Sequence, residues 1–200
     1  NNTAVGYNAL TANTTGTRNT AVGHKAGDNL TTGNYNVAVG SNQCLGAATT
    51  GSYNAIVGDG AQSQANASYV VAVGQAAAYA NQVNGTTAIG YAALSTLTTG
   101  AKATAVGYLA LQANTTGQNN TALGYEALKT ISDSGHHNTA IGADSLRVAT
   151  SARSNTGVGD GTMQALTTGD QNVAIGHNTM YNCTTGYQNT CVGSGAVGSN

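Results

Sequence analysis

A short motif, Thr-Ala-Val-Gly or a close variant, recurs along the whole chain at an almost constant interval. Consecutive copies are separated by 16 to 18 residues, which gives twelve units in 200 residues. A repeat of this length is typical of architectures in which one unit cannot bury its own apolar surface and stacks on its neighbours instead. The glycine that closes the motif falls at Gly6, Gly23, Gly40, Gly58, Gly74, Gly90, Gly107, Gly124, Gly142, Gly159, Gly176 and Gly193.

The unit is too short for a helix-turn-helix repeat, and a glycine in every unit opposes helix formation. Alternation within Asn-Thr-Ala-Val-Gly puts Thr and Val on one face of a strand and Asn, Ala and Gly on the other. We therefore predict an all-β fold, a parallel β-solenoid of twelve coils of about 17 residues, with residues 1–200 as a single repetitive domain. Each coil is expected to hold two short strands, one centred on Ala-Val and one on the Ala-Leu that follows.

One column of the repeat is aliphatic in every unit, and we interpret it as the structural core. The alanines between Thr and Val would then face away from that core, and a column of small residues permits the close approach of another backbone. This pattern predicts a parallel homotrimer in contact along the alanine column; a monomer whose alanines pack on their own loop is the alternative. The predicted core residues are Val5, Val22, Val39, Val57, Val73, Ile89, Val106, Leu123, Ile141, Val158, Ile175 and Val192.

Two further columns suggest how the chain turns between strands. An asparagine precedes the strand in most units, and stacked amides at this position are expected to hydrogen-bond from coil to coil; turn geometry alone could also favour asparagine there. A glycine follows the Thr-Thr segment in most units, and we expect it to supply a positive φ angle. These turn glycines are Gly16, Gly33, Gly51, Gly85, Gly100, Gly117, Gly135, Gly169 and Gly186.

Composition argues against several functional classes. The net charge of −1 and the 6% of charged residues give no field to attract nucleic acid, and no apolar run is long enough for membrane insertion. Asp59 and Asp160 share a column but lie six coils apart, too far for a glycosidase pair. We therefore expect no enzyme, no catalytic residues and no cofactor. We expect no metal site and interpret His136 and His137 as part of an exposed polar loop; they are candidate metal ligands only if a trimer axis brings copies together.

The unit Asn-Thr-Ala-Val-Gly-Tyr-Asn-Ala-Leu, residues 2–10, resembles the repeats of phage tail-fibre proteins, in particular those followed by an intramolecular chaperone domain. Its Thr-Ala-Val-Gly core is similar to the Ser-Val-Ala-Ile-Gly repeats in the YadA-like heads of trimeric autotransporter adhesins. The resemblance implies a left-handed parallel β-roll that trimerises. It also implies a segment of a longer fibre protein, located on a virion or otherwise extracellular or on a bacterial surface. The implied function is a structural shaft or adhesin rod that extends a host-binding apparatus towards a cell-surface glycan or protein.

Two other functions fit the repeat. A self-stacking extracellular filament would form if coils stack end to end. An ice-binding solenoid would present a flat row of threonine hydroxyls. The threonine column that could do so comprises Thr3, Thr20, Thr87, Thr104, Thr121, Thr139, Thr156 and Thr190.

Overall fold

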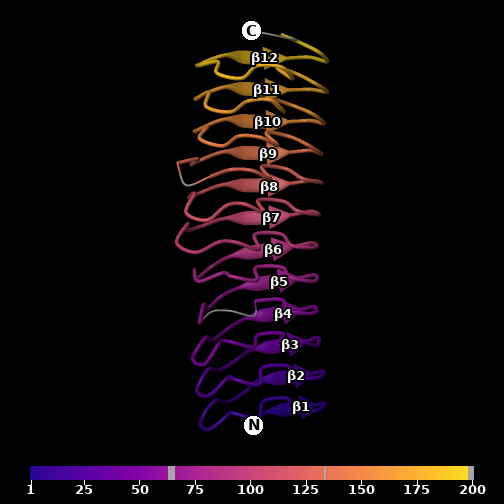
Figure 1. The fold of residues 1–200 in the computed structure, drawn as a ribbon, viewed down its shortest axis with the longest axis vertical. Coiled ribbons are helices and arrows are strands. Elements are labelled where there is room, and N and C mark those ends of the chain that lie inside the picture. The colour runs from indigo at the N-terminus through magenta and orange to yellow at the C-terminus, as the bar shows by residue number, and fades with distance from the viewer. Residues whose placement is uncertain (63–65, 133, 198–200) are drawn as a thin grey trace. The chain divides into compact units, whose positions relative to one another are not determined.

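The computed structural model describes residues 1–62, 66–132 and 134–197, and within them it is all-β, with twelve three-residue strands and no helix. The predicted β-solenoid is confirmed (Figure 1). The strands are β1 (Thr3–Val5), β2 (Thr20–Val22), β3 (Val37–Val39), β4 (Ala55–Val57), β5 (Val71–Val73), β6 (Thr87–Ile89), β7 (Thr104–Val106), β8 (Thr121–Leu123), β9 (Thr139–Ile141), β10 (Thr156–Val158), β11 (Val173–Ile175) and β12 (Thr190–Val192).

The chain forms two compact units, residues 1–98 with β1 to β6 and residues 99–200 with β7 to β12. Inside each unit every strand pairs in parallel with the strand of the next coil, and equivalent residues stand opposite each other, as Ala21 does to Ala38. The main-chain ladder continues at both strand ends, where Thr20 N donates to Asn36 O at 2.8 Å and Gly23 N to Val5 O at 2.7 Å. One coil therefore provides the hydrogen-bonding partners of the next.

Within the residues that the structure describes, each coil contains one strand, so the predicted second strand at Ala-Leu is wrong. The residues of the leucine column adopt left-handed backbone angles, with φ of 51° at Leu10 and at Leu111 and 49° at Leu128. Such angles are disfavoured for leucine by about 1–2 kcal/mol. The neighbouring coil holds them in place, because Leu111 N donates to Ala127 O at 3.0 Å and Leu128 N to Ser145 O at 3.1 Å. The segment is a stacked turn rather than a strand.

The assignment of the aliphatic column to the core is also wrong, because the strands point their alanines inward. Within β2, β3 and β5 the central alanine is buried while the valine after it is exposed. The residues of the predicted core that are exposed are Val5, Val22, Val39, Val57, Val73, Leu123, Ile141, Ile175 and Val192; Ile89, Val106 and Val158 are half-buried.

In most coils the interior has room for only a small residue on the strand because the turn supplies the bulky ones; β4 is the exception, since its central residue Ile56 is completely buried. Leu94, Leu128 and Met163 of the turn are completely buried. Gly157 occupies the alanine column of β10, and a Cβ atom there would lie 2.7 Å from Ser145 Oγ and 3.4 Å from Met163 Cε. A valine pointing inward would overlap these side chains, since protein interiors are close-packed.

The asparagine column forms the predicted coil-to-coil ladder. Asn36 Nδ2 donates to Asn19 Oδ1 at 3.0 Å, and the backbone N–H of Asn36 donates to the same oxygen at 3.0 Å. The bonds repeat between Asn155 and Asn138 and between Asn172 and Asn155. Each amide also donates to a turn carbonyl, as Asn19 does to Gly33 O at 2.8 Å. These buried amides are hydrogen-bonded, as buried polar groups generally are.

The turn glycines are needed for a different reason from the one predicted. Gly85 has a positive φ of 71°, but Gly16, Gly33, Gly51, Gly100, Gly117, Gly135, Gly169 and Gly186 do not. A Cβ atom at Gly16 would overlap the carbonyl oxygen of Gly33 in the next coil. The left-handed residue comes two positions later, at Arg18 and Tyr35 for example. Close stacking of backbones therefore selects glycine after Thr-Thr.

Candidate functional site

The outward face of the sheet is an unusual surface of each unit. It consists of the first and third residues of every strand, which flank the buried alanine. The strands hold it in register, because equivalent residues pair directly from coil to coil, as Thr104 does with Thr121 and Val106 with Leu123. We call these outward-pointing residues the sheet face.

The sheet face is uncharged and largely apolar. Its third-position column is aliphatic throughout, and its first-position column contains threonine, valine or alanine. The exposed fraction is 42% for Val37, 46% for Leu123 and 41% for Ile175. A solvent-facing side of a sheet is ordinarily polar, so an aliphatic column there makes the sheet face a candidate interaction surface.

The sheet face comprises the residues of the predicted core and the threonine column, together with Val37, Ala55, Val71 and Val173. The alanine column lies inside the coil, with Ala21, Ala105 and Ala140 completely buried, so the predicted contact of another chain along those alanines is wrong. Alternation along a strand separates the two faces but does not say which is inside. The available signal was side-chain volume, since the leucines of the turn must also fit within the coil.

The histidine pair lies in the turn before β9. His136 Nδ1 accepts a hydrogen bond from Gln118 N at 3.0 Å, and His137 Nε2 lies 3.2 Å from Asn119 Nδ2. The two rings face each other edge-on with centroids 6.3 Å apart. Both side chains contact the preceding coil, and within the described ranges no three His, Cys, Asp or Glu residues gather closely enough to hold a metal ion.

Aromatic side chains stack outside the turns. Tyr35, Tyr53 and Tyr69 form a ladder with ring centroids 4.8 and 5.1 Å apart and nearly parallel planes. Arg18 extends this ladder, with its guanidinium carbon 4.9 Å from the centre of the Tyr35 ring. Stacked rings and a cation over an aromatic face each contribute roughly 0.5–1.5 kcal/mol. The ladder stabilises consecutive turns and covers most ring faces.

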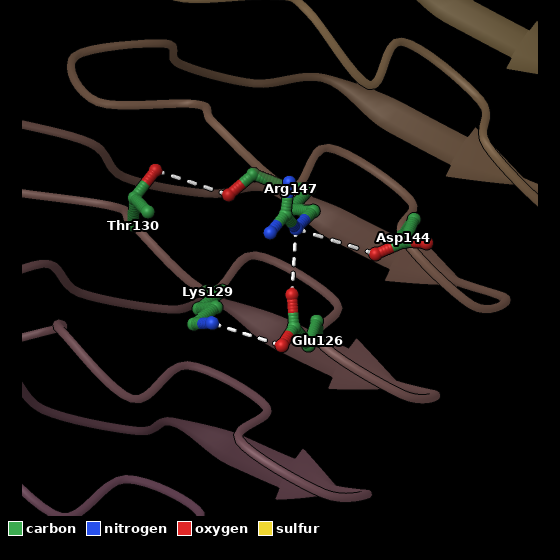
Figure 2. A network of polar contacts seen from close by, with 5 residues as sticks. All are labelled: Glu126, Lys129, Thr130, Asp144 and Arg147. Atoms are coloured by element: carbon green, nitrogen blue, oxygen red, sulfur yellow. Dashed lines mark hydrogen bonds and ion pairs between the residues drawn. The ribbon is translucent and has the colours of Figure 1, made fainter.

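One charged network connects two coils of the second unit (Figure 2). Glu126 has both carboxylate oxygens paired, Oε1 with Lys129 Nζ at 2.8 Å and Oε2 with Arg147 Nε at 2.6 Å. Arg147 Nε also lies 3.4 Å from Asp144 Oδ1. The hydrogen bond from Lys129, followed by that from Arg147, lowers the pKa of Glu126. Because both of its oxygens are paired, this carboxylate joins neighbouring coils.

Residues 1–62, 66–132 and 134–197 contain no helix of the length and apolarity that crossing a bilayer requires. No protein-family model, curated protein or solved structure matches the chain.

Proposed function

We propose that this chain is a structural shaft that assembles as a parallel homotrimer through its sheet face and extends a host-binding apparatus. The exposed aliphatic column supports the proposal. Covering the exposed two-fifths of one valine side chain recovers roughly 1 kcal/mol, and the gain recurs in every coil. The corresponding location is a virion tail fibre, with an extracellular or bacterial-surface rod as the alternative.

A second copy of this chain is the partner whose spacing fits the sheet face. The aliphatic side chains repeat once per coil, at the separation of paired strands, about 4.8 Å. Another copy carries the same repeat at the same separation, so the contact made in one coil can be made in every coil. Heterologous contacts of this kind close into a ring when the rotation between copies allows it, and three-fold symmetry is one closed solution.

The test is sedimentation velocity of the full chain and of Ile141→Lys. The substitution places a charge on the sheet face of β9, so we expect a trimer for the unmodified chain and a monomer for the variant, both with the same circular dichroism spectrum. Asn182→Lys is the matched control, because Asn182 is exposed and lies away from the strands. A monomeric unmodified chain at micromolar concentration refutes the trimer, and a mass that grows without limit indicates a self-stacking filament instead.

An ice-binding function is the second candidate, because the threonine column lies on the outward side of the strands. β7 to β10 begin with Thr104, Thr121, Thr139 and Thr156, paired in register and partly exposed. Such a surface could order water on a regular lattice. Thermal hysteresis of the monomeric fraction tests it: a gap between melting and freezing points that disappears in Thr121→Lys and Thr139→Lys would support ice binding.

A further inference from the structure

A hollow of about 470 Å³ opens on the turn side of the second unit. It is lined by Arg153, Ser154, Asp170, Gln171, Tyr187 and Gln188, which are two adjacent residues from each of three consecutive coils. Its volume lies within the range of small-molecule sites.

One side chain of a turn column beside the hollow, that of Ser154, is short. Ser154, Gln171 and Gln188 follow one another at the same place in successive coils, and all three have left-handed backbone angles. Gln188 Nε2 donates to Gln171 Oε1 at 3.0 Å, so these two amides form a continuous ladder. The serine side chain cannot reach its neighbour in this way, and space is left beside it.

The charged residues of the hollow are fixed by the backbone. Asp170 Oδ1 accepts the N–H of Arg153 at 2.8 Å, and Arg153 Nε donates to Ser134 O at 2.9 Å. The carboxylate keeps a second oxygen as an acceptor, and the guanidinium has further N–H donors. The amides of Gln171 and Gln188 add both donors and acceptors.

The set of side chains selects a neutral polyol. An anion would be attracted by Arg153 but repelled by Asp170. A cation would be attracted by Asp170 but repelled by Arg153, so a ligand of neither charge is favoured. Sugar hydroxyls both donate and accept, which suits adjacent carboxylate, guanidinium and amide groups. Tyr187 is 61% exposed and offers a ring against which the C–H face of a sugar can pack.

We propose that this hollow binds a neutral hexopyranose unit of a glycan. An open site for one sugar ring is expected to have a dissociation constant on the order of 1 mM. Its biological meaning depends on the display role proposed above, where several copies on one shaft would raise the avidity. Binding itself does not require that role.

The test is saturation-transfer difference NMR of the full chain with the methyl pyranosides of glucose, galactose and mannose, each up to about 50 mM, enough to fill a millimolar site. We expect transfer to at least one of them. Ser154→Gln supplies the missing amide in a column that already holds glutamine at Gln171 and Gln188, so it should fold normally and reduce binding at least tenfold. Tyr187→Ala should reduce binding similarly, and Tyr7→Ala, which removes another exposed tyrosine, should not.

Absence of transfer from all three sugars, or unchanged binding in Ser154→Gln, overturns the assignment. Tenfold tighter binding of methyl glucuronide than of any neutral sugar overturns the preference for a neutral ligand. The outcome of this test is independent of the shaft proposal. A monomeric chain that binds sugar would refute the trimer and support the binding site. A trimeric chain that binds no sugar would support the trimer and refute the binding site.

Discussion

Replacing Asn138 with alanine tests whether the buried amide ladder holds the coils together. Asn138 Oδ1 accepts from Asn155 N and from Asn155 Nδ2, each at 3.1 Å. Its Nδ2 donates to Ala152 O at 2.8 Å and to Asn120 Oδ1 at 3.3 Å. The side chain therefore joins three coils.

The expected loss follows from the groups left without these partners. Asn155 Nδ2 keeps its bond to Gly169 O, and Asn120 Oδ1 keeps the backbone N–H of residue 138. In the variant the buried N–H of Asn155 loses its acceptor, Asn138 Oδ1, and the carbonyl of Ala152 loses its donor, Asn138 Nδ2. Each buried group left unsatisfied costs about 1–3 kcal/mol, so Asn138→Ala should destabilise the fold by roughly 2–6 kcal/mol.

Urea unfolding, followed by far-ultraviolet circular dichroism and by tyrosine fluorescence, measures this loss. With a slope of about 2 kcal/mol per molar urea, the midpoint should fall by roughly 1–3 M. Asn182→Ala is the control, since that asparagine is exposed, and its free energy of unfolding should stay within about 0.5 kcal/mol of that of the unmodified chain. A loss below about 0.5 kcal/mol for Asn138→Ala would refute the argument and leave only a turn preference for asparagine.

Three other predictions address the backbone, the sheet face and the charged network. Gly169→Ala should lower the unfolding free energy by at least about 2 kcal/mol, because its methyl group would meet the carbonyl of the next coil, and urea titration checks this. Val106→Asp should lower the free energy of unfolding of the isolated chain by only about 1 kcal/mol, because Val106 points outward, but it should weaken self-association. If the isolated variant chain is unfolded, Val106 belongs to the interior and the prediction is wrong. The pKa of Glu126 is lowered by Lys129 and then by Arg147, so its stabilising contribution is present above the ordinary glutamate pKa and lost as pH falls through the lowered value. Acid unfolding of Glu126→Gln should lack that part of the pH dependence, and an unchanged acid profile would contradict this prediction.

The repeat determined the solenoid, the strand in each coil and the asparagine ladder. The motif recurs at intervals of 16 to 18 residues, so parallel stacking of coils is the way to provide hydrogen-bonding partners for the backbone of each strand. Stacking places identical amides such as Asn19 and Asn36 within bonding distance, so the ladder follows from the register alone.

The tertiary structure decided which side of the strand is inside. Alternation along the strand places the alanine and valine columns on opposite faces without saying which face is buried. Which column is buried depends on the volume that the rest of the coil leaves free. Leu128 and Met163 fill that volume from turn positions whose left-handed backbone the sequence did not reveal, so the strands turn their alanines inward and expose residues such as Ile141. The sugar-sized hollow likewise depends on Ser154 lying beside Asp170 and Tyr187, residues of three different coils that only stacking brings together.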